Sequence, residues 1–234
     1  MSASSGPDIV ENGLVLCLDA ANRKSYSGSG TVWTNLANKS LNSTISSATP
    51  FDNVYNGRIN FEGTSGSAIN GKTMTFPKWT ELNLSTSFTI SIWFSFTRSS
   101  PSFFDFILGC ESYLNRGFRA GLAAGTNKIG FFSTQSGGTF NHVTNHAVTL
   151  NTIFNYTITF DVNTGITYIN GAFDKQTTGT FVSPNASDNF FYNNVSGGNR
   201  SNSHVSGIQI YNRALTAAEV LQNYKALKGR FGLT

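Results

Sequence analysis

The chain has 234 residues, of which 39% are hydrophobic and 13% aromatic, and this is enough apolar material for one large β domain or two small ones. Charged residues make up only 12%, about half the usual share, which excludes long helices that rely on surface ion pairs. The net charge of +4 comes from scattered Lys and Arg residues, so the sequence predicts no nucleic-acid partner. No segment approaches the roughly 20 apolar residues of a membrane span, so membrane insertion is not predicted either.

The start of the chain, "MSASSGPDIVEN", lacks basic residues followed by an apolar stretch. The sequence therefore predicts no secretion leader and synthesis in a cytoplasm, with residues 1–12 as a flexible N-terminal arm. The rest is expected to form one domain, with its body at residues 13–212 and a capping helix and tail at residues 213–234. Cys17 and Cys110 lie far apart in apolar stretches, and two buried thiols are expected there rather than a disulfide.

The first strand candidates alternate polar and apolar residues with a period of two. "GLVLCLDA" places Leu14, Leu16 and Leu18 on one face, and "RINFEG" is the next candidate. The alternation is sharpest in "SFTISIWFSFT", which predicts a strand with one dry and one wet side. The dry side comprises Phe88, Ile90, Ile92, Phe94 and Phe96, and the wet side comprises Thr89, Ser91, Trp93 and Ser95.

Later candidates are "FDFILGC", "GFRAGLAAG", "KIGFFST" and the long stretch "YTITFDVNTGITYINGAFDKQT". In the long stretch, Asn163-Thr164-Gly165 is expected to join two strands, and Asn170-Gly171 predicts a two-residue turn that needs positive φ. A three-stranded meander follows from these turns, and "HVSGIQIYN" is the final candidate. About twelve strands with frequent turns predict an all-β fold, a two-sheet antiparallel sandwich.

One short helix is predicted near the end of the chain, in "LTAAEVLQNYKALKG". Thr216 and Glu219 have the spacing of a capping box, in which each side chain binds a free N–H group of the first turn. The helix is expected to begin at Ala217 and to stop at Lys228-Gly229. Its apolar stripe is expected to dock on the sandwich, and it comprises Val220, Leu221, Tyr224 and Leu227.

Three of these stretches also resemble a known family. "FTISIWFSF", "YTITFDVNTGITYINGAF" and "VSGIQIYNRALTAAEVLQNY" are similar, in order and spacing, to the laminin-G-like jelly rolls of the concanavalin A-like lectin and glucanase superfamily. The similarity covers about residues 13–228, and its most specific element runs from Ile210 to Leu215. The resemblance implies a jelly roll whose last strand turns into a short helix that closes the sandwich, with Asn212 and Arg213 holding the turn.

A second, narrower resemblance concerns the two ends of the chain. "IVENGLVLCLDAANRKSYSGSGTVWTNL" and "YKALKGRFG" look like the start and end of lectin-like domains in tail and capsid-associated proteins of bacteriophages, notably marine phages and cyanophages. This resemblance implies a virion protein, made in the host cytoplasm, whose partners are other virion structural proteins. It also implies a homo-oligomer, because such particles are symmetric.

The superfamily includes lectins, glycosidases and inert structural domains, so chemistry must be sought in the residues themselves. A retaining glucanase needs two carboxylates about 5 Å apart, and the Glu-x-Asp-x-Glu pattern that would align them on one strand is missing. The nearest approach, Asp105 and Glu111, is separated by an apolar segment. Serines lack a Gly-x-Ser-x-Gly elbow that leads into a helix. The sequence therefore predicts no enzyme activity.

Metal ligands are equally sparse. The local pairs Asp19 with Asn22 and Asp161 with Asn163 are interpreted as turn residues, since Ca²⁺ prefers six or more oxygen ligands. His142 and His146 have i, i+4 spacing, but they lack helix signals and a nearby carboxylate. No metal or other cofactor is predicted.

Recognition by surfaces and loops is what remains. Sugar binding uses an aromatic face and a few amides, and three polar loop candidates together with one aromatic on the wet side of a strand offer such groups. The candidate ligand or interface residues are Trp93, Tyr113, Asn115, Arg116, Phe140, His142, Tyr192, Asn199 and Arg200. Ordinary solvated loops, and for Trp93 packing under a neighbouring loop, are the alternatives.

The sequence thus predicts a non-enzymatic phage virion component that decorates the capsid or tail and uses a lectin-like jelly roll for assembly. The alternative is a carbohydrate-binding adhesin that recognises glycans on the host surface. A glycan-cleaving enzyme is the third possibility, and it would need carboxylates brought together from different strands.

Overall fold

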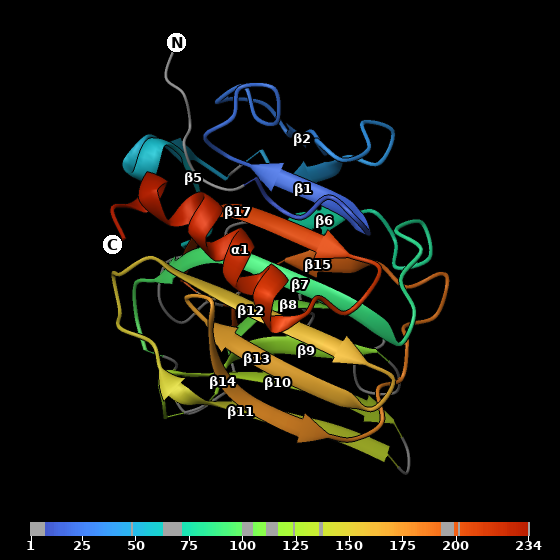
Figure 1. The fold of residues 1–234 in the computed structure, drawn as a ribbon. Coiled ribbons are helices and arrows are strands. Elements are labelled where there is room, and N and C mark those ends of the chain that lie inside the picture. Colours follow the sequence, from blue (N-terminus) through green and yellow to red (C-terminus); the bar gives the residue numbers. More distant parts are fainter. Residues whose placement is uncertain are drawn as a thin grey trace.

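Two β-sheets stack face to face as a sandwich, and the helix α1 (Ala217–Lys228) lies across the outer side of one of them (Figure 1). The computed structural model describes residues 8–47, 49–62, 72–99, 105–110, 117–123, 125–135, 138–192, 199–200 and 202–233. This architecture confirms the predicted all-β jelly-roll sandwich with one short C-terminal helix.

Sheet A has eight strands within the described ranges, and neighbouring strands run antiparallel. In spatial order they are β14 (Ala172–Thr178), β13 (Thr164–Ile169), β12 (Phe154–Asp161), β7 (Ser87–Phe96), β17 (Ser203–Tyr211), β5 (Arg58–Asn60) and β4 (Phe51–Asp52), with β1 (Leu14–Asp19) also beside β17. The predicted meander is confirmed as β12, β13 and β14.

Among the residues that the structure describes, sheet B has nine strands. In spatial order they are β11 (Gly138–Ala147), β10 (Lys128–Gln135), β9 (Phe118–Leu122), β8 (Asp105–Cys110), β15 (Phe190–Tyr192), β6 (Met74–Phe76), β3 (Ser43–Ile45) and β2 (Val32–Trp33), with β16 (Asn199–Arg200) parallel to β8. Two 3-10 turns complete the described elements, η1 (Val54–Asn56) and η2 (Gly229–Phe231).

The main core lies between the sheets and is unusually aromatic. The predicted dry side of β7 faces it, and Phe88 lies at its centre, with its ring centroid 5.0 Å from Trp79 and 5.6 Å from Phe160. Leu16 and Leu18 of β1 are also fully buried there. The period-two alternation therefore identified the inward-facing residues of β7 correctly. In β1 it was wrong for Leu14, which packs in the outer cluster under α1 because the pairing of β1 with β17 shifts register between Leu14 and Leu16.

The predicted wet side of β7 is wrong, because all four of its side chains are buried. Ser91 accepts hydrogen bonds from the Asn155 amide and the Thr157 hydroxyl at 2.9 Å, and Thr89 donates one to the Arg213 carbonyl oxygen. α1 folds back over this side of sheet A, so the polar side chains are satisfied by one another instead of by solvent.

Both predicted turns of the meander exist, and one is displaced. Asn170 and Gly171 have positive φ angles of 51° and 73°, as the sequence predicted. A Cβ at position 171 would lie 2.8 Å from that of Tyr224, so the close approach of α1 also requires glycine. The turn between β12 and β13 is formed by residues 162–163, with Thr164 already paired in β13.

The start of α1 follows the prediction. Thr216 and Glu219 form a reciprocal capping box. The Arg213 guanidinium contacts the Glu219 carboxylate at 2.6 Å and holds its pKa down to about 2, which confirms the role of Arg213 in the turn. Asn212 contributes its backbone N–H, which donates to the Gly13 carbonyl oxygen.

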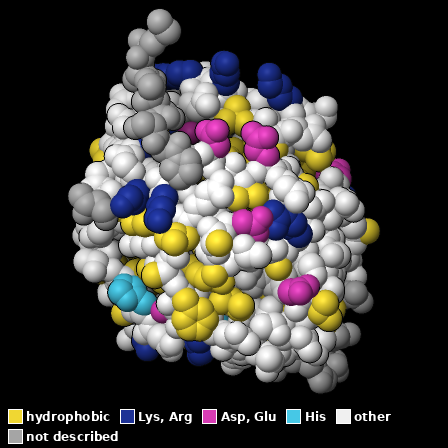
Figure 2. All heavy atoms as spheres, in the orientation of Figure 1, with side chains coloured by type: hydrophobic (Ala, Val, Ile, Leu, Met, Phe, Trp, Pro, Cys, Tyr) yellow, Lys and Arg dark blue, Asp and Glu magenta, His cyan; other side chains and the backbone are white. Residues whose placement is uncertain are grey.

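α1 ends at Lys228 with a basic last turn, as predicted, but the glycine after it does not adopt the left-handed conformation of a glycine stop. Gly229 is right-handed and continues into η2, and the left-handed residue is Gly232, with φ of 69°. Leu221 also departs from the predicted docking stripe, since it is 38% exposed. Figure 2 shows this face of the molecule, where apolar side chains gather near the helix and charges of both signs are scattered.

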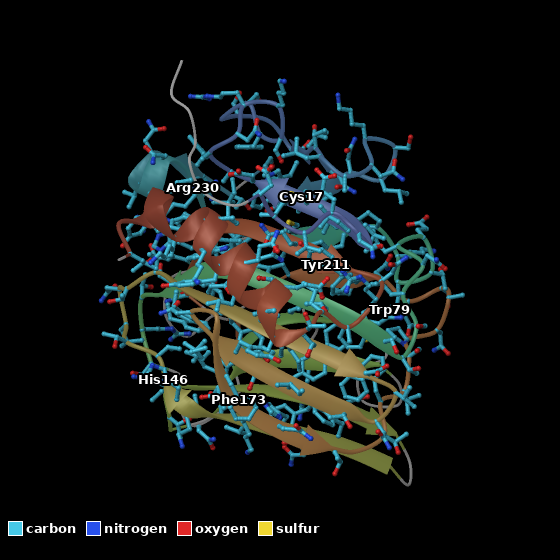
Figure 3. The ribbon with its side chains drawn as sticks, in the orientation of Figure 1. Cys17, Trp79, His146, Phe173, Tyr211 and Arg230 are labelled. Carbon is cyan, nitrogen blue, oxygen red and sulfur yellow. The ribbon has the colours of Figure 1, made fainter. Side chains whose placement is uncertain are left out.

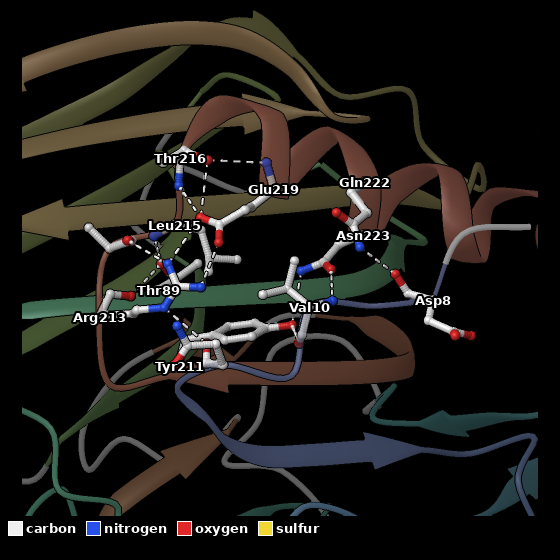
Figure 4. A network of polar contacts seen from close by, with 12 residues as sticks. Asp8, Val10, Thr89, Tyr211, Arg213, Leu215, Thr216, Glu219, Gln222 and Asn223 are labelled. Carbon is white, nitrogen blue, oxygen red and sulfur yellow. Dashed lines mark hydrogen bonds and ion pairs between the residues drawn. The ribbon is translucent and has the colours of Figure 1, made fainter.

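Residues 8–12 are held against α1 (Figure 4). The Val10 N–H donates to the Asn223 side chain at 2.8 Å, and the Gln222 amide donates to the Asp8 carbonyl oxygen. Arg213, just before the helix, donates to the Asn12 carbonyl oxygen. The predicted flexible arm is therefore anchored over these residues, and residues 1–7 lie outside the described part of the chain.

Side chains bridge one pair of sheet edges, β14 of sheet A and β11 of sheet B. The Asp174 carboxylate accepts backbone N–H groups of Asn145 and His146 at 2.9 and 2.8 Å, and the Lys175 ammonium donates to the Val143 carbonyl oxygen. These contacts occupy β11 backbone groups that an edge strand would otherwise expose to another chain.

Both cysteines are buried free thiols, as predicted. No helix in the described ranges is long and apolar enough to cross a membrane.

Candidate functional site

Four of the sequence-predicted site residues are buried, which corrects the expectation that they lie in surface loops or on a solvated face. Trp93 is stacked against Tyr224 and Phe231 beneath the C-terminal segment, with ring centroids 5.6 and 4.3 Å away. Phe140 belongs to β11 and points into the main core, as does Tyr192 of β15. These side chains stabilise the fold rather than present a binding surface.

His142 also lies on β11 and is fully buried. Its two ring nitrogens contact the hydroxyls of Thr177 and Thr167 at 2.8 and 2.9 Å, so it links sheet B to sheet A. Burial, together with the nearby Lys175 ammonium, lowers the pKa of His142 to about 4. The imidazole is therefore neutral at physiological pH and serves as a structural cross-link.

The remaining predicted site residues lie on a short strand or outside the described part of the chain. Asn199 and Arg200 form β16, whose backbone pairs with the start of β8. Tyr113, Asn115 and Arg116 lie outside the described residues.

A different set of residues forms a continuous row across the outer face of sheet B. The strand registers place one residue from each of eight neighbouring strands directly opposite the next. In order these are Val32, Thr44, Thr75, Phe191, Gly109, Arg119, Phe132 and Asn141, and they are called the sheet B row below. With strands about 4.8 Å apart, the row spans roughly 34 Å.

The sheet B row combines aromatic rings with polar groups. The Arg119 guanidinium lies over the Phe132 ring, 5.7 Å from its centroid, and both side chains are partly exposed. Asn141 next to them is exposed, and Phe191 on the other side is partly exposed. Between Phe191 and Arg119 the row has Gly109, so the two larger side chains flank a position without one.

This arrangement is suited to recognition. Aromatic rings offer flat apolar surfaces, while the guanidinium and amide supply hydrogen bonds to hydroxyl groups. A cation over a ring also holds both groups in a fixed geometry before any ligand arrives.

Sequence reasoning missed the sheet B row, although a signal existed. "KIGFFST" and "NFFY" each contain two adjacent phenylalanines, and a strand must send neighbouring side chains to opposite faces. Phe131 and Phe190 face the core, which leaves Phe132 and Phe191 on the outside. Doubled aromatics in a strand therefore mark an outward-facing ring.

Reactive groups were sought elsewhere in the described ranges. Burial raises the pKa of both the Cys17 and the Cys110 thiol to about 12, which disfavours the thiolate form. The described residues contain no group of three or more His, Cys, Asp or Glu side chains placed to hold a metal ion.

The fold defines a lectin-like jelly roll, and the family comparison agrees. The model of the Concanavalin A-like lectin/glucanases superfamily matches residues 64–221, and the chain belongs to this family. The search of curated proteins gave no significant match.

Solved structures share the fold at low sequence identity. The binding domain of Paraclostridial Mosquitocidal Protein 1 aligns with a TM-score of 0.72 and 16% identity over 92% of this chain and 52% of that chain. Domain 4 of AbnA, an extracellular arabinanase from Geobacillus stearothermophilus in complex with arabinotriose, aligns with a TM-score of 0.70 and 14% identity. The alignment covers 92% of this chain and 100% of that chain.

The binding domain of Botulinum Neurotoxin DC in complex with SialylT aligns with a TM-score of 0.68 and 13% identity over 93% of this chain and 52% of that chain. The chain thus spans about half the length of the toxin binding domains that it matches. At these identities the likeness establishes the fold.

Proposed function

We propose that this protein is a non-catalytic recognition domain that binds an oligosaccharide across the outer face of sheet B. The observation that carries the proposal is the sheet B row, in which Phe191 is followed across Gly109 by Arg119, Phe132 and Asn141, all of them exposed or partly exposed. Two structures of the same fold support it, since they are complexes with arabinotriose and SialylT.

The direct test is a glycan array followed by titration of the strongest ligand with wild-type protein and the variant Phe132→Ala. Removing the ring takes away a stacking surface and the partner of Arg119, so we expect at least about tenfold weaker binding. Phe191→Ala is expected to act in the same direction from the opposite side of Gly109.

Phe173→Ala is the matched control. Phe173 is also a phenylalanine on an outer strand face, 64% exposed, but it belongs to β14 of sheet A. Binding should be unchanged in this variant. Equal losses in Phe132→Ala and Phe173→Ala, or no glycan bound by the wild type, would overturn the proposal.

The virion role and the absence of enzyme activity are proposals as well. The two segments that resemble phage structural proteins are in contact in the fold, where Arg230 pairs with Asp19 at 2.6 Å. We propose a virion component, which quantitative mass spectrometry of purified particles tests by copy number against the major capsid protein. Release of reducing ends from host glycan by the pure protein would contradict the non-catalytic assignment.

A further inference from the structure

The charged side chains on the strands are divided unequally between the two sheets. Within the described part of the chain, every acidic side chain on a strand belongs to sheet A, and these are Asp19, Asp52, Asp161 and Asp174. On the strands of sheet B the described Lys and Arg side chains are Arg119 and Lys128, and no Asp or Glu side chain is described there. The described charge on sheet B is therefore positive.

The acids nearest to this question are engaged within the fold. The Asp19 carboxylate contacts Arg230, which Figure 3 shows beyond the end of α1, at 2.6 Å. Asp174 accepts the β11 backbone N–H groups described above. Asp188, which precedes β15, is buried, and its carboxylate accepts the Asn185 backbone N–H at 2.9 Å. None of these acids belongs to the sheet B row.

Arg119 lies inside the sheet B row, directly opposite Gly109 on one side and Phe132 on the other. Its guanidinium carbon lies over the Phe132 ring, 5.7 Å from the centroid, and the side chain is partly exposed. The N–H groups of a guanidinium point outward in its plane, and two of them match two oxygens of a carboxylate or a sulfate. The row thus contains an anion-binding group beside an aromatic surface.

Lys128 adds a second positive charge to the same face. It lies on β10 four residues before Phe132, and because alternate side chains of a strand point the same way, both face outward. Ile129 and Phe131 face the core, and Gly130 between the two outward residues has no side chain. The separation along β10 is about 13 Å. An elongated ligand on this face therefore lies within the attraction of both basic groups.

The inference drawn from these charges rests on the proposed oligosaccharide site and specifies its ligand. We infer that the sheet B row selects acidic oligosaccharides, whose carboxylate or sulfate groups bind Arg119 while their sugar rings lie on Phe132 and Phe191. Lys128 attracts chains that carry more than one acidic group. A neutral oligosaccharide binds more weakly, because hydrogen bonds between two charged groups are about twice as strong as those between neutral groups.

The test is an array of oligosaccharides in matched acidic and neutral forms, followed by calorimetric titration of the strongest ligand. Hexagalacturonate is paired with its methyl ester, and a carrageenan hexasaccharide with its desulfated form. We expect the strongest ligand to be acidic, to bind at least tenfold more tightly than its neutral form, and to bind more weakly as the NaCl concentration rises. A neutral strongest ligand, or equal affinities within a pair, would overturn the inference.

Phe132→Ala separates failure of this inference from failure of the proposed function. If the neutral forms bind as tightly as the acidic forms and Phe132→Ala weakens both, the oligosaccharide site stands and the acidic preference is wrong. If no oligosaccharide binds, both are wrong.

Arg119→Gln tests the residue to which the preference is assigned. Gln removes the charge but still bonds hydroxyl groups, so we expect at least tenfold weaker binding of the acidic ligand and less than a threefold change for its neutral form. Arg119→Lys keeps the charge without the paired N–H geometry and should restore part of the preference. Circular dichroism checks that each variant is folded.

Lys225→Gln is the matched control for net charge. It removes one positive charge from an exposed position on α1, on the sheet A side, and should leave the affinity for the acidic ligand unchanged. Equal losses in Arg119→Gln and Lys225→Gln would mean that net charge alone attracts the ligand. Either that result or unchanged binding by Arg119→Gln would contradict the assignment.

Discussion

The outer faces of sheet A and sheet B have similar residue types but differ in exposure to solvent. Each carries asparagine, threonine and aromatic side chains at outward positions. On sheet A the side chains under α1 and η2 are buried, where Asn155 donates to Ser91 and Trp93 stacks on Tyr224, while Phe173 on the edge strand β14 stays exposed. On sheet B they stay accessible, as Asn141 and Phe132 show.

The comparison teaches that polarity alone does not tell which face of a sheet meets solvent. A polar face can be buried if its side chains form a closed hydrogen-bond network, and α1 makes the outer face of sheet A a second, partly polar core. The recognition site that we propose lies on the face without such a cover. The following predictions test this difference, from the largest expected effect to the smallest.

Trp93→Ala should give the largest effect. The ring is 1% exposed and packs against Tyr224 and Phe231, so its removal leaves a cavity and should lower the free energy of unfolding by about 4 kcal/mol. Phe132→Ala, on the exposed outer face of sheet B, should lower the free energy of unfolding by about 1 kcal/mol. Urea unfolding followed by circular dichroism measures both. Equal losses of unfolding free energy in the two variants would contradict the conclusion that sheet A is covered and sheet B is open.

Asn155→Ala and Asn141→Ala form a matched pair of smaller changes. Asn155 is 2% exposed, and its amide donates to Ser91. Asn155→Ala leaves its buried hydrogen-bond partners unpaired, so we expect the free energy of unfolding to fall by about 2 kcal/mol. Asn141 is exposed, and its replacement should change stability by less than about 0.5 kcal/mol. A larger effect at Asn141 would show that sheet B is covered in solution.

The pH dependence of stability tests the edge where the two sheets meet. His142 stays neutral in the folded protein down to about pH 4, whereas the unfolded chain takes up a proton near pH 6.5. The unfolded state therefore binds more protons in this window, and stability should fall by about 2 kcal/mol between pH 7 and pH 5.

His142→Gln should reduce the dependence of the free energy of unfolding on pH between pH 7 and pH 5, the slope below. His146→Gln, an exposed control on the same strand, should keep this slope. Unfolding midpoints in urea at a series of pH values provide the measurement. His204, whose pKa burial also lowers, contributes the remainder of the slope. A wild-type slope in His142→Gln would refute the assignment.

Thr216→Ala should have the smallest effect among the changes to the covered side of the molecule. It removes the side-chain cap of the helix that covers sheet A, and we expect a loss of about 1 kcal/mol. Thr44→Ala, at an exposed position in the sheet B row, should change stability by less than about 0.5 kcal/mol. Thermal unfolding at constant pH compares the two variants.

Much of the fold could be predicted from local patterns. The alternation in β7, the Asn170-Gly171 turn and the capping box at Thr216 each depend on residues near one another in the chain. β11 could not be predicted in this way, because "GTFNHVTNHA" has little hydrophobic alternation and forms a strand through pairing with β10 and contacts from Asp174. The site residues chosen from that stretch, Phe140 and His142, were misplaced for the same reason.

The sequence by itself determined the fold class, the inward-facing side of the long strands and the first residue of α1, since short-range sterics and periodicity specify these features. Only the tertiary structure decided which outer face is covered, where Trp93 and His142 lie, and which side chains share the sheet B row. Those features depend on strand register and on where α1 docks, and both are set by contacts between segments far apart in the chain.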